Sequence, residues 1–150
     1  MTRFLRDEAA TIALASEVYR ALPEDHAGWM ILLTGELGAG KSTFARALIK
    51  AAGHGGSVPS PTYTLVEPYK LASGNIYHID LYRISAEDEL YYLGFDELDD
   101  GLCLVEWPDR APRLAEAADL LVELRYEGPA RHATLVGHSE RGHALTLKIN

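Results

Sequence analysis

The segment from Gly35 to Ser42 reads Gly-Glu-Leu-Gly-Ala-Gly-Lys-Ser and fits the phosphate-loop pattern G-x-x-x-x-G-K-[ST]. Glycines let the backbone curl so that successive N–H groups point inward at phosphates, and Gly38 and Gly40 carry no Cβ atom that would forbid a positive φ. Lys41 can reach the β- and γ-phosphates, and the Ser42 hydroxyl suits Mg²⁺. The sequence therefore predicts a nucleoside triphosphate site formed by Gly35, Gly38, Ala39, Gly40, Lys41, Ser42 and Thr43.

The residues on either side of this loop are of the kind that surround a phosphate loop. Residues 29–34 form an apolar run typical of a buried strand, and residues 41–52 are rich in helix formers. A strand, a glycine loop and a helix in this order place phosphate at the N-terminus of the helix.

Hydrophobic patterning predicts the remaining elements. We expect an amphipathic helix at 7–22, a hairpin of 62–69 and 75–83, a short acidic helix at 86–93, a buried strand at 102–105, and three strands at 118–126, 133–136 and 144–149, the last two pairing as a hairpin. The fold class that follows is α/β, a P-loop NTPase-like mixed sheet with flanking helices and an antiparallel extension. The length predicts a single domain over residues 1–150.

The composition of the chain limits which ligands and compartments are compatible with it. The chain has 14 basic and 22 acidic side chains, a formal net charge of −8, which argues against nucleic acid as a primary ligand because neutralising phosphates needs a basic face. No apolar run reaches the length of a membrane span, and the N-terminus lacks the apolar core of a signal peptide. Cys103 lies in an apolar run and is expected to be a buried thiol in a reducing compartment. We therefore expect a cytoplasmic protein with no membrane contact.

A phosphate-loop enzyme also needs a carboxylate at a strand end to hold Mg²⁺. Glu106 directly follows the buried run at 102–105, so a parallel sheet would deliver it into the ligand crevice. Asp80 ends a segment that alternates, which suits a strand exposed on one face. The pattern favours Glu106 as the metal ligand, and Asp80 either orients the attacking water or a metal-bound water, or is a solvated acid.

Ser60, Thr62 and Thr64 bring three hydroxyls together beside two prolines. In a triphosphatase such a segment can sense the γ-phosphate, as switch loops do. The alternative is a proline-fixed start of the hairpin, and the residues alone leave both interpretations open.

Several other polar and aromatic residues are expected to have no role in the chemistry. Glu36 lies in the loop at a position for which the motif requires no particular residue, so we expect an exposed spectator. Trp107 is expected to pack in the core. The histidines show no metal-ligand spacing, and His132, His138 and His143 are expected at the surface. The residues that contact adenine are not evident, with Thr11 and the C-terminal strands as candidates.

Four blocks of the sequence stand out together: residues 35–44, 60–69, 77–83 and 104–108. In their order and spacing they resemble a known family, TsaE, formerly called YjeE, the bacterial ATPase of tRNA threonylcarbamoyladenosine biosynthesis. Beyond Pro108 nothing in the chain is diagnostic. The family often has threonine in place of Ser42, and the hydroxyl that a metal needs is retained.

The resemblance implies a fuller description of the activity. Such proteins bind and weakly hydrolyse ATP with Mg²⁺, and they act with the TsaD–TsaB pair, which transfers threonylcarbamoyl to the adenosine beside the anticodon. ATP hydrolysis would reset that complex, and tRNA would be contacted only through the partners. By position, Lys41 and the loop amides would hold phosphates, while Ser42 and Glu106 would hold Mg²⁺. Asp80 would be an essential acid near the γ-phosphate, and residues 60–64 the switch-like loop.

Three other functions compete with this one. A small-molecule kinase of the nucleoside or shikimate type shares the phosphate loop, but it needs a lid carrying arginines, and the segment after Glu106 offers only Arg110 and Arg113 among prolines. A GTP-binding switch would need an Asn-Lys-x-Asp motif, which the sequence does not contain. An ATP-binding module without hydrolysis is disfavoured by the complete set of Lys41, Ser42 and Glu106.

Overall fold

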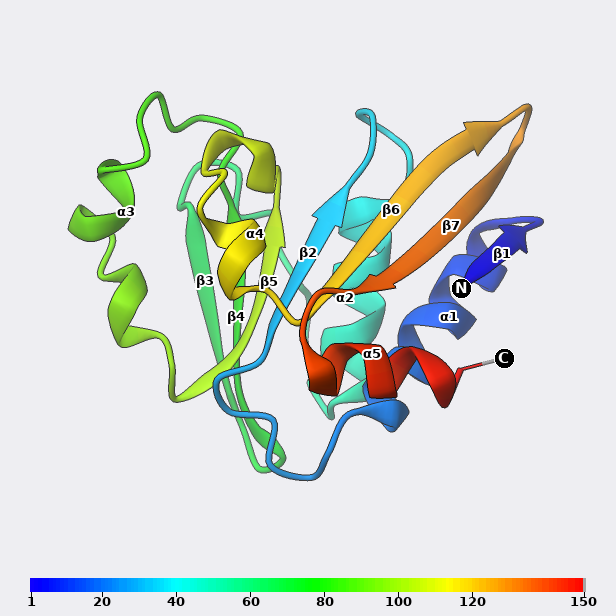
Figure 1. The fold of residues 1–150 in the computed structure, drawn as a ribbon, viewed down its shortest axis with the longest axis horizontal. Helices are drawn as coiled ribbons and strands as arrows, with labels where there is room; N and C mark the ends of the chain where they lie inside the picture. The colour runs from blue at the N-terminus through cyan, green and yellow to red at the C-terminus, as the bar shows by residue number, and fades with distance from the viewer. Residues whose placement is uncertain (150) are drawn as a thin grey trace.

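A computed structural model describes residues 1–149 of the chain, and within them seven strands form one mixed sheet in the order β1-β7-β6-β2-β5-β4-β3 (Figure 1). The strands are β1 (Thr2–Leu5), β2 (Met30–Thr34), β3 (Val66–Leu71), β4 (Gly74–Asp80), β5 (Gly101–Glu106), β6 (Leu120–Glu127) and β7 (Ala130–Gly137). The helices are α1 (Glu8–Ala21), α2 (Lys41–Ala51), α3 (Glu89–Tyr92), α4 (Leu114–Ala117) and α5 (Glu140–Leu147), with short 3₁₀ turns η1 (Phe95–Glu97) and η2 (Pro108–Arg110).

The centre of the sheet is parallel and its margins are antiparallel. Strands β6, β2, β5 and β4 run in the same direction, while β3 pairs antiparallel with β4, and β7 pairs antiparallel with both β6 and β1. Because parallel strands end at the same edge, the last residues of β2, β5 and β4 lie together where α2 begins. This edge is where a ligand binds in open α/β sheets.

Both faces of the sheet are covered. Helices α1 and α2 pack against each other and against one face, in a core that includes Leu14, Phe44 and Leu104. The short elements α3, η1 and α4 cover the other face of β4 and β5 and bury Leu90, Phe95 and Leu114 (Figure 1). The α/β mixed sheet with flanking helices and antiparallel margins is the architecture that the sequence predicts.

The local signals at the first helix and the hairpin are confirmed. Helix α1 begins after Asp7, whose carboxylate accepts a hydrogen bond from the Ala10 N–H at 3.0 Å, as an N-cap residue does. Strands β3 and β4 form the expected hairpin. The hairpin starts later than the sequence indicates, because residues 62–65 form a turn that ends at Leu65 with φ of 69°.

The strand predicted at 144–149 is wrong, because these residues belong to α5 and the turn that follows it. Ser139 caps this helix by accepting from the Gly142 N–H, and Leu145 and Ile149, four residues apart, reach the core. A short alternation of apolar residues fits the period of a strand or that of a helix, and the sequence does not show which side faces the core. The C-terminal hairpin is therefore formed by β6 and β7 around Gly128, instead of by the last two predicted strands.

Two further features at the margins of the sheet differ from the expectations. Strand β1, which the sequence did not predict, pairs with β7 and places Leu5 in the core. Strand β4, expected to be exposed on one face, is buried along Ile76–Asp80 because β3 covers its outer edge and both faces are packed. Its alternation comes from His78 and Asp80 facing the functional site instead of solvent.

Within residues 1–149, none of the helices combines the length and the apolar character that a membrane crossing requires.

Candidate nucleotide site

The loop between β2 and α2 contains three glycines at positions where the backbone has no room for a side chain or adopts a positive φ. Gly35, Gly38 and Gly40 have φ values of 144°, 83° and 112°, in the region that side-chain-bearing residues rarely adopt. A Cβ atom on Gly35 would also collide with the carbonyl oxygen of Leu124 on the neighbouring strand β6. The positive φ predicted for Gly38 and Gly40 is confirmed, and the loop leads into the N-terminus of α2.

Lys41, the first residue of α2, is buried and folds back over its own loop. Its ammonium donates to the carbonyl oxygens of Gly35 at 2.5 Å and Glu36 at 3.1 Å, and it lies 4.2 Å from the centre of the Trp107 ring. Burial lowers the pKa of Lys41, although the carboxylates of Glu106 and Asp80 partly oppose that shift. A desolvated ammonium whose hydrogen-bond acceptors are both neutral carbonyl groups is suited to exchange them for an anion such as phosphate.

A cavity of about 290 Å³ opens between this loop and the carboxyl ends of β4 and β5. Its walls carry most of the residues that the sequence singled out, together with two aromatic side chains: Leu37, Gly38, Gly40, Lys41, Ser42, Thr43, Thr62, Asp80, Tyr82, Glu106 and Trp107. Gly35 and Ala39 belong to the same loop but do not line this cavity.

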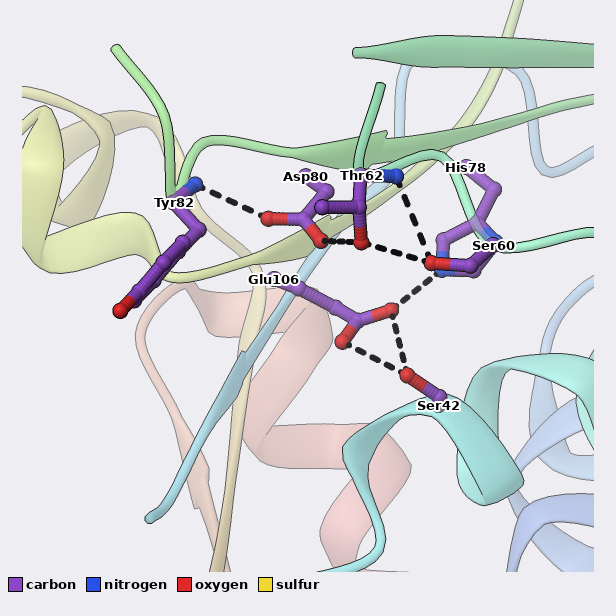
Figure 2. A network of polar contacts seen from close by, with 7 residues as sticks. All are labelled: Ser42, Ser60, Thr62, His78, Asp80, Tyr82 and Glu106. Atoms are coloured by element: carbon purple, nitrogen blue, oxygen red, sulfur yellow. Dashed lines mark hydrogen bonds and ion pairs between the residues drawn. The ribbon is translucent and has the colours of Figure 1, made fainter. Parts of the chain in front are cut away.

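Glu106 is the last residue of β5 and is only 2 % exposed. Its carboxylate accepts from the Ser42 hydroxyl, at 3.2 Å through Oε1 and 3.5 Å through Oε2, and Oε2 lies 2.6 Å from Nε2 of His78 (Figure 2). The predicted pair of Ser42 and Glu106 is thus brought into direct contact.

Asp80 ends β4 directly opposite Glu106 in the parallel register. One of its oxygens accepts from the Thr62 hydroxyl at 3.2 Å and the other from the Tyr82 N–H at 2.9 Å (Figure 2). Thr62 is in turn 2.7 Å from the Ser60 hydroxyl. A strand-end carboxylate therefore connects the hydroxyl-rich segment to the cavity.

Thr64, the third hydroxyl of that segment, does not join the network. Its hydroxyl donates to Glu67 at 2.9 Å on the exposed side of the turn. Glu36 is exposed, as expected for a spectator.

Three residues of the site were not identified from the sequence: His78, Tyr82 and Trp107. The expectation that Trp107 packs in the core holds only in part, since its ring packs on Tyr82 and also lies under Lys41. Trp107 has φ of 57°, a strained conformation for such a residue. A tryptophan directly after the strand-end Glu106 and a histidine two positions before Asp80 were the available signals.

A second hollow of about 130 Å³ lies on the other side of the loop. It shares Gly38, Gly40 and Thr43 with the larger cavity. Its remaining walls come from Ala39, from residues 5–11 at the end of β1 and the start of α1, and from the β6–β7 hairpin, and they include Thr11 and Arg131. Thr11, a candidate for contact with adenine, is thus next to the loop.

The oxygen ligands at this edge fit a magnesium ion. Across the part of the chain described, no three His, Cys, Asp or Glu side chains gather into a metal site of their own. Mg²⁺ does not require one, because it keeps several waters and is bound by one or two protein oxygens together with substrate phosphates. Ser42 and the buried carboxylate of Glu106 provide such oxygens.

The fold and this edge define a P-loop NTPase fold. A crystal structure of Bacillus subtilis YdiB superimposes with a TM-score of 0.73 and 24 % sequence identity, covering 99 % of this chain and 92 % of that one. The segment after Glu106 holds only the three-residue η2 and the four-residue α4, so within residues 1–149 it forms no lid of the kind that a small-molecule kinase needs.

The chain belongs to the TsaE family. The model of the threonylcarbamoyl adenosine biosynthesis protein TsaE matches residues 5–133. The TsaE protein of Haemophilus influenzae is 36 % identical over 146 residues, which are 95 % of this chain and 92 % of that protein. The TsaE protein of Synechocystis is 37 % identical over 120 residues, 76 % of this chain and 74 % of that protein. Both relatives are named tRNA threonylcarbamoyladenosine biosynthesis proteins.

Proposed function

We propose that this protein is a Mg²⁺-dependent ATPase, weakly active alone, that serves threonylcarbamoyl modification of the adenosine next to the anticodon in tRNA by acting on the TsaD–TsaB complex in the cytoplasm. The observation that carries the proposal is the convergence of Lys41, Ser42, Asp80 and Glu106 on one cavity, in a chain of the TsaE family.

Binding begins at the loop. The phosphates of ATP take the place of the Gly35 and Glu36 carbonyl groups at the Lys41 ammonium, and the backbone N–H groups of residues 38–43 surround the β-phosphate. Base and ribose occupy the hollow beside Thr11 and Arg131, because it adjoins the phosphate cavity across Gly40.

Ser42 and Glu106 are the residues that would hold Mg²⁺. When bound, the ion would neutralise charge on the phosphate oxygens. The protein's contribution is to present a hydroxyl and a desolvated carboxylate at a fixed separation, with the carboxylate at the end of a buried strand.

Asp80 would orient the attacking water. The Thr62 hydroxyl and the Tyr82 N–H already fix its two oxygens, so that the carboxylate faces the cavity in one orientation. A water held by Asp80 attacks the γ-phosphorus, the bond to the β-phosphate oxygen breaks, and inorganic phosphate and ADP result. Residues 60–64 would respond to the γ-phosphate through Thr62.

Two features support low activity in isolation and dependence on a partner. Lys41 is the one lysine or arginine among the described residues that line the cavity, and P-loop NTPases without an arginine at the γ-phosphate hydrolyse slowly. Leu37, which lines the cavity, is 80 % exposed, and Tyr63, which follows the cavity-lining Thr62 in the chain, is 83 % exposed. Such side chains around a cleft indicate a surface that another protein covers.

The test is ATP turnover by the purified protein, measured alone and with the TsaD–TsaB pair. We expect slow turnover alone and a marked increase with the pair. Turnover that is indifferent to the pair would leave a P-loop ATPase with another partner.

A matched pair of variants tests the surface. Tyr63→Ser should lower the ratio of turnover with the pair to turnover alone, because it removes an exposed ring next in the chain to the cavity-lining Thr62. Tyr92→Ser is the control, since Tyr92 is 82 % exposed but lies on α3. An equal effect of both substitutions would place the contact elsewhere.

A further inference from the structure

The carboxylate of Glu106 has a partner outside the cavity. Nε2 of His78 lies 2.6 Å from Oε2 of Glu106, and the His78 side chain is only 2 % exposed (Figure 2). We propose that His78 is a positioning residue that holds the Glu106 carboxylate in the orientation needed to bind the metal of the nucleotide complex. This inference rests on the proposed function, since it concerns the same metal site.

The direction of the hydrogen bond follows from the chemistry of the two groups. An ionised carboxylate only accepts, so the proton of this bond is on Nε2 of His78. The other ring nitrogen, Nδ1, is buried and has no hydrogen-bond partner among the described residues. Among the described residues, the His78 ring therefore makes one hydrogen bond, to Glu106, and does not connect Glu106 to a second group.

The placement of the ring behind Glu106 comes from the sheet. His78 stands two residues before Asp80 on β4, so both side chains lie on the same face, and Asp80 is paired with Glu106 in the parallel register. His78 does not line the cavity, whereas Asp80 and Glu106 do. It acts on the ligand site only through Glu106.

When His78 holds one carboxylate oxygen of Glu106, the other oxygen is available to bind the metal. With Oε2 bonded to His78, Oε1 faces the Ser42 hydroxyl at 3.2 Å, on the side where the loop and the cavity lie. Without the imidazole the carboxylate is free to rotate toward the Lys41 ammonium, whose charge it already attracts. The same rotation would weaken metal binding and leave the phosphate contacts of the loop in place.

The test compares three substitutions. His78→Gln keeps an N–H donor at nearly the reach of Nε2, His78→Leu removes the donor at similar size, and His78→Asn carries a donor too short to reach Glu106. Two constants are measured for each protein: ADP affinity in EDTA, and the affinity of the protein–ADP complex for Mn²⁺, followed by the electron paramagnetic resonance of free Mn²⁺. Neither readout depends on turnover.

We expect His78→Leu to weaken Mn²⁺ binding by about 10- to 100-fold, as loss of a group that orients a metal ligand does, while ADP affinity in EDTA stays within about twofold. His78→Gln should restore most of the Mn²⁺ affinity. If His78→Leu does not fold, His78→Asn takes its place against His78→Gln with the same expectation.

Two results would overturn the positioning role. One is unchanged Mn²⁺ affinity in His78→Leu, and the other is an equal loss of ADP affinity in EDTA, which a merely structural residue would give. Failure of the proposed function is recognised separately, because the unsubstituted protein would then bind neither ADP nor Mn²⁺, and the positioning role would fall with it.

Discussion

Lys41 is a buried cation whose hydrogen-bond partners are two carbonyl groups of its own loop. Lys41→Met keeps the length of the side chain and removes the charge, so the fold should persist while the phosphates lose a charge-assisted contact. Such contacts contribute about 1.5–3 kcal/mol, which corresponds to a loss of about 10- to 150-fold in ATP affinity. Isothermal titration with ATP and Mg²⁺ measures it, with Lys50→Met on the exposed side of α2 as control. ATP turnover at the unsubstituted rate in Lys41→Met would refute the phosphate-loop assignment.

Cys103 is a buried thiol whose acidity is changed by its surroundings. Burial raises the pKa of its thiol to about 12, with smaller contributions from Asp100 and Asp99. The unfolded thiol ionises near its ordinary pKa of 9.0, so the free energy of unfolding has its full contribution from Cys103 below pH 9 and loses it as the pH rises toward 12. At pH 10 the loss is about 1.4 kcal/mol.

Urea unfolding at pH 8 and pH 10 checks this prediction. Cys103→Ala should be less stable at both pH values because it leaves a small void, but it should lose about 1.4 kcal/mol less than the unsubstituted chain between them. An identical loss in both proteins would contradict the assignment of the change to Cys103. At pH 8 the native thiol should also resist alkylation.

At the scale of elements, α5 is held by one buried carboxylate. Asp119 accepts from the Met30 N–H, the Ser139 hydroxyl and the guanidinium of Arg141, and so connects the start of α5 to the start of β2. Burial by itself raises the pKa of Asp119, but these hydrogen bonds outweigh it and the pKa is lowered. Its stabilisation is therefore present above the ordinary pKa of an aspartate and is lost as the pH falls through the lowered value.

Asp119→Ala should reduce the free energy of unfolding by about 2–3 kcal/mol, because a part-buried N–H, a hydroxyl and a guanidinium lose their acceptor. Since Met30 begins β2 and the phosphate loop follows its other end, ATP affinity should not change. Chemical unfolding measures the free energy of unfolding of this variant, and titration with ATP measures its ATP affinity. A loss of ATP affinity with intact folding would show that α5 is coupled to the site.

The difference between local signals and contacts distant in the chain explains which elements could be predicted from the sequence. The apolar periodicity of residues 7–22 and the run of 29–34 before the glycines are local signals, and both gave the element observed. Helix α5 was predicted as a strand because its start is fixed by contacts of Ser139 and Arg141 with Asp119. Asp119 lies 20 residues or more before them in the chain, so no local pattern shows these contacts. Strand β1 is too short to show a period and exists through its pairing with β7.

The site divides in the same way. Lys41 and Ser42 follow from the loop motif, and the position of Glu106 follows from the buried run before it. His78 was not predicted because its contact depends on the register between β4 and β5, which no local pattern reveals. The ring of Trp107 reaches Lys41 only through a backbone conformation with positive φ.

At the scale of the molecule, the two ends of the parallel strands have different roles. The carboxyl ends of β2, β4 and β5 gather the charged and polar side chains of the cavity, and the opposite end carries the structural network of Asp119. We therefore expect stability and ligand binding to be separable by substitution. This separation makes loss of ATP affinity in a folded variant a measure of the site itself.

The overall charge makes a prediction about tRNA. The formal net charge is −8, so the chain lacks the cationic excess with which proteins neutralise phosphates and release counterions. We expect no saturable binding of unmodified tRNA by the isolated protein at physiological salt, measured by fluorescence anisotropy of labelled tRNA. The TsaD–TsaB pair, measured alone under the same conditions, is the positive control, since the proposal assigns the tRNA contact to it. Saturable binding by the isolated chain that weakens steeply with salt would reveal a basic tRNA-binding face and contradict an indirect role.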